Sequence, residues 1–146
     1  MHIIGFGNAG CNIARQFEQH SQYEIHYIDV GEEYNLPKSI TVEEAEKNTP
    51  IFKKLIKKIK AKDEVVFFCA GGGITSGSIL SILESIKHAE LSVVYVRPDI
   101  NFLNSVALLR EKLVYRVLQE YARSSALERL YIISNPAVAE VLGNLA

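Results

Sequence analysis

A run of six apolar residues at positions 65–70 (VVFFCA) constrains the fold of this chain more than any other feature of its sequence. A strand that is apolar at every position is buried on both faces, which is typical of a central strand in a parallel sheet covered by helices. Four other short apolar or β-branched runs alternate with segments of helical period. This alternation predicts an α/β fold, a Rossmann-like three-layer sandwich around a mostly parallel central sheet of about five strands.

The expected elements follow from these periods and from the glycines, prolines and capping residues between them. The expected strands span residues 2–5, 24–29, 65–70, 91–96 and 130–133. The expected helices span residues 8–20, 51–62, 76–89 and 102–124, and a last helix begins at Pro136. Residues 31–39 are expected to form a loop. A chain of 146 residues has the length of a single domain, 1–146, and is long enough to bury a core.

Charge and hydropathy argue against several classes of function. The formal net charge is −1, so we expect neither a general nucleic-acid surface nor attraction to anionic lipid. No apolar run reaches membrane-spanning length, and Met1 leads directly into a strand-like segment rather than a signal peptide. We therefore expect a cytoplasmic protein without a nucleic-acid or membrane partner.

The residue types that most often catalyse reactions or bind metals show no clear pattern. The cysteines, Cys11 and Cys69, are expected to be free buried thiols, because no Cys/His cluster accompanies them and two cysteines do not form a disulfide scaffold. We expect the histidines to be surface or strand-edge residues without a carboxylate partner: His2, His20, His26 and His88. We also expect residues 110–112, and the six lysines between positions 53 and 62, to lie on solvated helix faces. No catalytic residue and no metal site is predicted.

The segment GFGNAGCN, residues 5–12, lies between the first expected strand and the first expected helix. Glycines allow positive φ and close backbone approach to a ligand, and a helix N-terminus supplies unpaired N–H groups, so this turn is suited to bind phosphate. The turn is not a Walker A loop, because GxxxxGK[ST] is absent from the sequence. Gly5, Gly7 and Gly10 also match the dinucleotide fingerprint, and Asp29 closes the second strand where an acid binds the adenosine ribose. Taken alone, this turn favours an NAD-type site.

A second glycine-rich segment, AGGGITSGS at residues 70–78, follows the most apolar strand and opens another expected helix. Its glycine triplet and the hydroxyls of Thr75 and Ser76 form a second phosphate cradle. Helix N-capping would explain one or two of the hydroxyls but not the three glycines. A dinucleotide site has no need of this second cradle, so the two turns together favour a nucleoside triphosphate.

Three segments resemble the nucleotide-binding half of the tubulin/FtsZ superfamily, in the order of that family. Residues 63–102 resemble its strand, GGGTG[ST]G signature loop, helix, strand and Lys-Pro-Phe-Asn-Phe-like turn. GFGNAGCN resembles its first phosphate loop, and residues 128–142 (ERLYIISNPAVAEVL) resemble the strand and loop whose asparagine reads guanine. The resemblance implies a GTP- or GDP-binding domain of a cytoskeletal filament protein, with Mg²⁺ at the phosphates and head-to-tail self-association in a longer form.

The candidate site residues fall into two groups. We expect the nucleotide phosphates to contact Gly7, Asn8, Ala9, Gly10, Cys11, Gly71, Gly72, Gly73, Ile74, Thr75, Ser76 and Gly77. We expect the base or the ribose to contact Asn12, Asp29, Asp99, Asn104 and Asn135.

The chain departs from the family pattern at several positions. Ile74 and Thr75 replace the Thr-Gly pair of the signature loop, and Leu103 stands where the family has a ribose-binding Glu. The family's long central helix, catalytic acidic loop and second domain are not present in this sequence. We therefore expect hydrolysis of GTP by this chain alone to be weak or absent, and whether it is an enzyme stays open.

Two other functions remain open. An NAD(P)-binding Rossmann domain would use Gly5, Gly7, Gly10 and Asp29. A nucleotide-free interaction module would be consistent with Ile74, with Leu103 and with the missing second half of the family.

Overall fold

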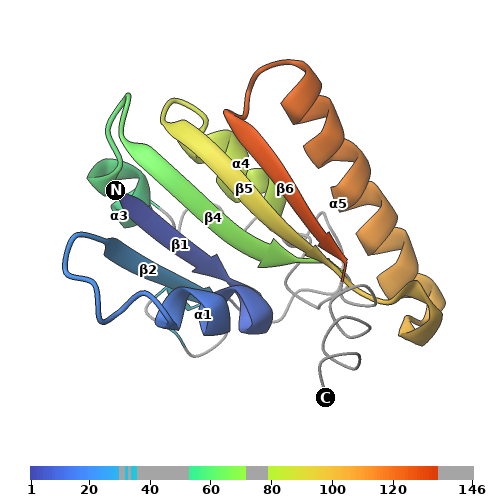
Figure 1. Ribbon diagram of the computed structural model, residues 1–146. Helices are drawn as coiled ribbons and strands as arrows, with labels where there is room; N and C mark the ends of the chain where they lie inside the picture. Colours follow the sequence, from blue (N-terminus) through green and yellow to red (C-terminus); the bar gives the residue numbers. More distant parts are fainter. Residues whose placement is uncertain (30–31, 33, 36–52, 72–78, 135–146) are drawn as a thin grey trace.

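The computed structural model describes residues 1–29, 32, 34–35, 53–71 and 79–134. These residues form a six-stranded sheet in the order β3-β2-β1-β4-β5-β6, and each described pair of strands is parallel (Figure 1). The strands are β1 (His2–Phe6), β2 (Glu24–Asp29), β3 (Tyr34–Asn35), β4 (Glu64–Ala70), β5 (Glu90–Arg97) and β6 (Arg129–Ser134). The helices are α1 (Gly7–Arg15), α3 (Lys53–Lys58), α4 (Ile79–Ile86) and α5 (Ser105–Arg123), with a short 3-10 helix, η3 (Ile100–Phe102). The predicted α/β fold is confirmed, and it is compatible with a Rossmann-like sandwich.

Helices pack on both faces of the sheet (Figure 1). On one face α1 contacts β1, β2 and β4, and a small buried cluster forms around Ile3, Ala14 and Phe68. On the other face α3, α4 and α5 contribute Leu55, Leu83 and Leu118 to a larger cluster. β4 belongs to both clusters, because Phe67 faces one and Phe68 the other. The prediction that this strand is buried on both faces is therefore confirmed.

Element boundaries differ from the expected ones at several helix ends. The expected helix 8–20 ends at Arg15. The expected helix 102–124 begins later, because the Asn104 side chain accepts the Ala107 N–H (2.8 Å), whereas the Asp99 carboxylate accepts the Asn101 N–H (3.0 Å) in η3. Asn104 is thus the N-cap of α5, and the regular helix begins at Ser105. β3 lies in the expected loop, because two residues are too few to produce a detectable period. The helix expected from Pro136 lies outside the described residues.

Within the described ranges, no helix combines the length and the apolar character that a membrane span requires.

Candidate functional site

The strand order reverses between β1 and β4, since β1 is followed outward by β2 on one side and β4 by β5 on the other. Gly5 of β1 pairs with Phe68 of β4, so the carboxyl ends of the two strands lie at nearly the same level. Gly7 and Gly71 directly follow these two neighbouring strands, so by the register of β1 and β4 they lie near the same end of the sheet. In open α/β sheets, ligands bind at the carboxyl ends of the strands where the order reverses. The fold thus brings the starts of both predicted phosphate turns to this position.

The N-terminus of α1 has neither a side-chain cap nor an acidic residue in its first turn. Gly7 has φ of 72°, in the left-handed region that glycine adopts without a steric penalty. Phe6 precedes the helix and gives it no side-chain cap, and its first turn carries no acidic residue. Asn8 is exposed and Ala9 is half-buried. The first turn of α1 therefore offers N–H donors and the positive end of the helix dipole.

Two glycines of the first turn are required by packing rather than by a ligand. A Cβ added to Gly10 would lie 2.2 Å from the backbone oxygen of Phe68, and a Cβ on Gly5 would lie 2.8 Å from the Cβ of Ala14. Both glycines let α1 approach the sheet closely, which is the role of the third glycine in the dinucleotide fingerprint. The presence of these glycines alone therefore does not identify a phosphate contact.

Gly71 has a comparable packing role at the end of β4. Its added Cβ would lie 1.9 Å from the hydroxyl oxygen of Tyr95, and its N–H donates to the Val96 carbonyl (3.4 Å). The predicted phosphate residues that follow lie outside the described residues: Gly72, Gly73, Ile74, Thr75, Ser76 and Gly77. Asn135, predicted to read the base, also lies outside them.

Cys11 is buried, and its side chain points into the packing between α1 and the sheet. Its Sγ donates to the Gly5 carbonyl oxygen (3.3 Å). Burial, with smaller contributions from the nearby carboxylates of Asp29 and Glu32, raises the pKa of the thiol to about 11. The thiol is therefore protonated near neutral pH, and any contact of Cys11 with a phosphate would come from its backbone.

Asn12 and Asp29 lie on the β2 side of the reversal point. Arg15 donates from Nη1 to the side-chain oxygen of Asn12 (2.9 Å) and forms an ion pair with Glu32. The Arg15 guanidinium also lies 5.2 Å from the centre of the Tyr27 ring. Asp29 is half-buried at the end of β2. Asn12 therefore belongs to a polar group with Arg15 and Glu32 beside α1.

Asp99 and Asn104 lie on the opposite side, after β5, where their side-chain oxygens cap η3 and α5. Two strands, β1 and β4, separate β2 from β5, so the ends of β2 and β5 are roughly 14 Å apart at the usual strand spacing. A single ribose cannot contact Asp29 and Asp99 together. The structure therefore divides the predicted base and ribose residues into two alternative groups.

A buried charged network beside Gly71 was missed by the sequence reasoning. Glu111 is fully buried and accepts hydrogen bonds from Arg97 Nε (2.8 Å) and the Tyr95 hydroxyl (3.4 Å). Its Oε2 has no hydrogen-bond partner among the described residues. The expectation that residues 110–112 form a solvated face is therefore wrong for Glu111. α5 places this position against β5, and helical period alone does not reveal an arginine partner fourteen residues away.

The interpretation of the histidines as scattered surface residues is also wrong for two of them. His2 is 7% exposed and His26 is 2% exposed. They contact each other, and His2 also contacts Glu24 and Asp63. Parallel pairing of β1 with β2 brings these side chains together, at the edge of the sheet opposite the glycine turns.

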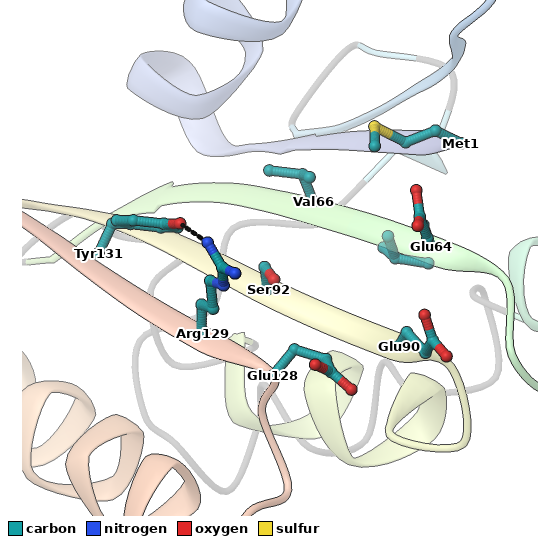
Figure 2. Close-up of a pocket in the computed structure, with 9 residues that line it drawn as sticks. Met1, Glu64, Val66, Glu90, Ser92, Glu128, Arg129 and Tyr131 are labelled. Carbon is teal, nitrogen blue, oxygen red and sulfur yellow. Dashed lines mark hydrogen bonds between the residues drawn. The ribbon is translucent and has the colours of Figure 1, made fainter.

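A depression of about 410 Å³ lies near the amino ends of β4, β5 and β6. Figure 2 shows the residues that line it. Glu64, Glu90 and Glu128 line one part of it, and Arg129 donates to the Tyr131 hydroxyl (3.2 Å) in another. The three carboxylates would repel a phosphate, and the glycine turns lie at the other end of the strands. This depression is therefore not part of the candidate nucleotide site.

Neither the protein-family models nor the curated proteins searched contain a match to this sequence.

Proposed function

We propose that this chain binds a purine nucleoside triphosphate, GTP, with its phosphates at the adjacent carboxyl ends of β1 and β4. The observation that carries the proposal is the pairing of Gly5 with Phe68, which puts the starts of both glycine turns at one level of the strand reversal. The α1 N-terminus, without a side-chain cap, supplies N–H donors for phosphate oxygens. The preference for guanine and the role as a filament-protein domain rest on the resemblance to the tubulin/FtsZ superfamily.

A dinucleotide is the second candidate, and the position of Asp29 favours it. Asp29 ends β2 beside α1, where a dinucleotide-binding fold places its ribose-binding acid. Under this alternative, Asp29→Asn should weaken NADH binding by about tenfold or more, because a charge-assisted hydrogen bond is lost. If the GTP ribose lies on the Asp99 side, the same variant should change GTP binding little.

A parallel titration tests the proposal. Fluorescent GTP, fluorescent ATP and NADH are each added to the purified chain with Mg²⁺, and binding is followed by anisotropy or intrinsic nucleotide fluorescence. We expect saturable binding, with GTP preferred. Saturable binding of NADH alone would contradict the proposal in favour of the dinucleotide, and binding of none of the three would favour an interaction module. Gly72→Val should abolish GTP binding and affect NADH binding much less, since its Cβ would occupy the phosphate space.

The α1 N-terminus offers a sharper variant. Asn8 is exposed, so Asn8→Asp changes charge at nearly constant shape and places a carboxylate where the phosphate is expected. Charge repulsion should weaken GTP binding by about tenfold or more, while an acid in the first helical turn leaves the fold intact. Gln19→Glu, in the exposed turn after α1, is the matched control with the same charge change. Equal losses in both variants would indicate a net-charge effect instead of a phosphate site.

A further inference from the structure

The end of the sheet at which its parallel strands begin is called the amino edge here, and the end at which they finish the carboxyl edge. The amino edge carries a cluster of imidazoles and carboxylates that the proposed function does not use. His2 and Glu24 are the first residues of β1 and β2 and pair with each other. His26 follows two positions along β2, on the same face of the strand. Asp63 directly precedes β4. Parallel pairing thus brings together groups that are separated by as many as 61 residues.

The spacing of three of these groups matches the requirements of a metal ion. His2 Nδ1 lies 3.2 Å from His26 Nε2 and 3.5 Å from Glu24 Oε2. All three atoms lie within 4.8 Å of one another. Ligand atoms of a tetrahedral Zn²⁺, with bonds of about 2.0–2.1 Å, are separated by roughly 3.3–3.5 Å. An ion could therefore be bound by these atoms with small side-chain rotations.

Asp63 sets the orientation of His2 from the other side of its ring. The Asp63 Oδ2 atom lies 3.1 Å from His2 Nε2 and also accepts the Lys60 N–H (2.9 Å). Because a backbone N–H can only donate, this oxygen of Asp63 is an acceptor. His2 Nε2 therefore carries the ring proton, and the Nδ1 lone pair faces His26 and Glu24. A carboxylate bonded to the far nitrogen is the usual outer partner of a metal-binding histidine.

His26 reaches the cluster from the interior of the protein. Its imidazole is almost fully buried, and its Nε2 faces His2 Nδ1. Lys58 of α3 is a positive charge near the cluster and would weaken cation binding. Glu24 and Asp63 provide two carboxylates beside His2, so the acidic side chains around the three ligand atoms outnumber this lysine.

We propose that His2, His26 and Glu24 form a binding site for a divalent transition-metal ion, Zn²⁺, with Asp63 as the positioning residue for His2. Imidazole nitrogens and one carboxylate are ligands that Zn²⁺ accepts, and three protein ligands leave the fourth position to water. In the absence of metal, the contact between His2 Nδ1 and His26 Nε2 is a hydrogen bond that holds one proton. The metal takes the place of this proton, which moves to the other nitrogen of the His26 ring or to solvent. A bound ion would connect β1 to β2 and stabilise the amino edge independently of any nucleotide.

Zinc titration of the untagged protein, after treatment with chelator and dialysis, tests this site. We expect calorimetry near neutral pH to give one equivalent of Zn²⁺, and thermal unfolding to shift upward with added Zn²⁺. Mg²⁺ and Ca²⁺ should have no comparable effect, because they prefer all-oxygen sites. Co²⁺ should give visible bands of a nitrogen- and oxygen-bound ion without a thiolate charge-transfer band. A thiolate band would overturn the proposal, because it would assign the metal to Cys11 or Cys69, as would the absence of saturable Zn²⁺ binding.

Substitutions of Glu24 and Asp63 test whether these residues contribute to Zn²⁺ binding. The Glu24 side chain is 59% exposed, so Glu24→Gln should preserve the fold and weaken Zn²⁺ binding by about tenfold or more. Asp63→Asn should weaken it by about 10–100-fold through the lost orientation of His2. Glu90→Gln, at the exposed start of β5 on the same edge of the sheet, is the matched control and should bind as the original protein does. Unchanged affinity in both Glu24→Gln and Asp63→Asn would overturn the proposal.

Discussion

The carboxyl edge of the sheet presents glycines and helix N–H groups, whereas its amino edge presents imidazoles and carboxylates. At the carboxyl edge the available groups belong to the backbone of α1, with Gly71 directly after β4. At the amino edge it comes from the side chains of His2, Glu24 and His26, which belong to two strands. One edge is suited to an anion and the other to a cation.

The two proposals place sites of opposite charge preference at the two ends of one parallel sheet. All strands point the same way, so one edge collects the helix N-termini and the other collects the first residues of the strands. The length of β1, five residues, keeps the two sites apart by about 15 Å along the strand. The following predictions test how far each edge depends on its own residues.

The largest effect is expected from Gly10→Ala at the carboxyl edge. The added Cβ would meet the backbone oxygen of Phe68 at 2.2 Å, and backbone cannot move aside as a flexible side chain does. We expect the free energy of unfolding to fall by about 3 kcal/mol or more, measured by urea denaturation. Asn12→Ala, on the exposed face of the same helix, is the control and should change it by less than about 1 kcal/mol. Equal stability of the two variants would mean that α1 does not approach β4 this closely.

The amino edge should respond to pH in the metal-free protein. Burial lowers the pKa of His26 from 6.5 to about 4, so between these values the unfolded chain binds a proton that the folded chain does not. The contribution of neutral His26 to the free energy of unfolding is fully present above pH 6.5 and is lost as the pH falls toward 4. The loss should reach about 3 kcal/mol at the acidic end, measured by denaturation at each pH. His26→Gln should flatten this part of the pH profile, and an unchanged profile would contradict the assignment to His26.

A double-mutant cycle tests the contact between Gly71 and Tyr95. Gly71→Ala should lower the free energy of unfolding by about 2 kcal/mol, because its Cβ meets the Tyr95 hydroxyl at 1.9 Å. In a Tyr95→Phe background the same change should cost about 1 kcal/mol less, since the obstructing oxygen is gone. Chemical denaturation of the four proteins gives the coupling energy. Strict additivity would show that the two positions do not touch.

The smallest effect is expected from Asn8→Asp without ligand. A carboxylate in the first turn of α1 interacts favourably with the helix dipole and should raise the free energy of unfolding by about 0.5 kcal/mol. Gln19→Glu, beyond the helix, should give no such gain. A gain in stability would show that the new carboxylate interacts with the helix dipole. A loss of GTP affinity in the same variant would show that the α1 N-terminus also contacts the phosphate. A gain in stability with unchanged GTP affinity would place the phosphate elsewhere.

Much of the fold could be predicted because its signals are local. The apolar run 65–70 predicted a strand buried on both faces, and β4 is such a strand. The β2 boundaries were also correct. β3 was missed because two residues have no period, and the start of α5 at Ser105 was missed because the N-cap Asn104 resembles an ordinary polar residue.

The candidate site was predictable only in part. The positions of the glycine turns after two strands followed from sequence, but the packing roles of Gly10 and Gly71 depend on Phe68 and Tyr95, which lie on other strands. The burial of Glu111 beside Arg97 was equally unpredictable.

By itself the sequence determined five of the six strands and the approximate places of the described α-helices, because period and backbone freedom are properties of neighbouring residues. Only the tertiary structure decided that β1 lies between β2 and β4, and with it which side chains meet. The histidines illustrate the difference most clearly. His2 and Asp63 are 61 residues apart, and a contact at such separation depends on strand order and register rather than on any local pattern.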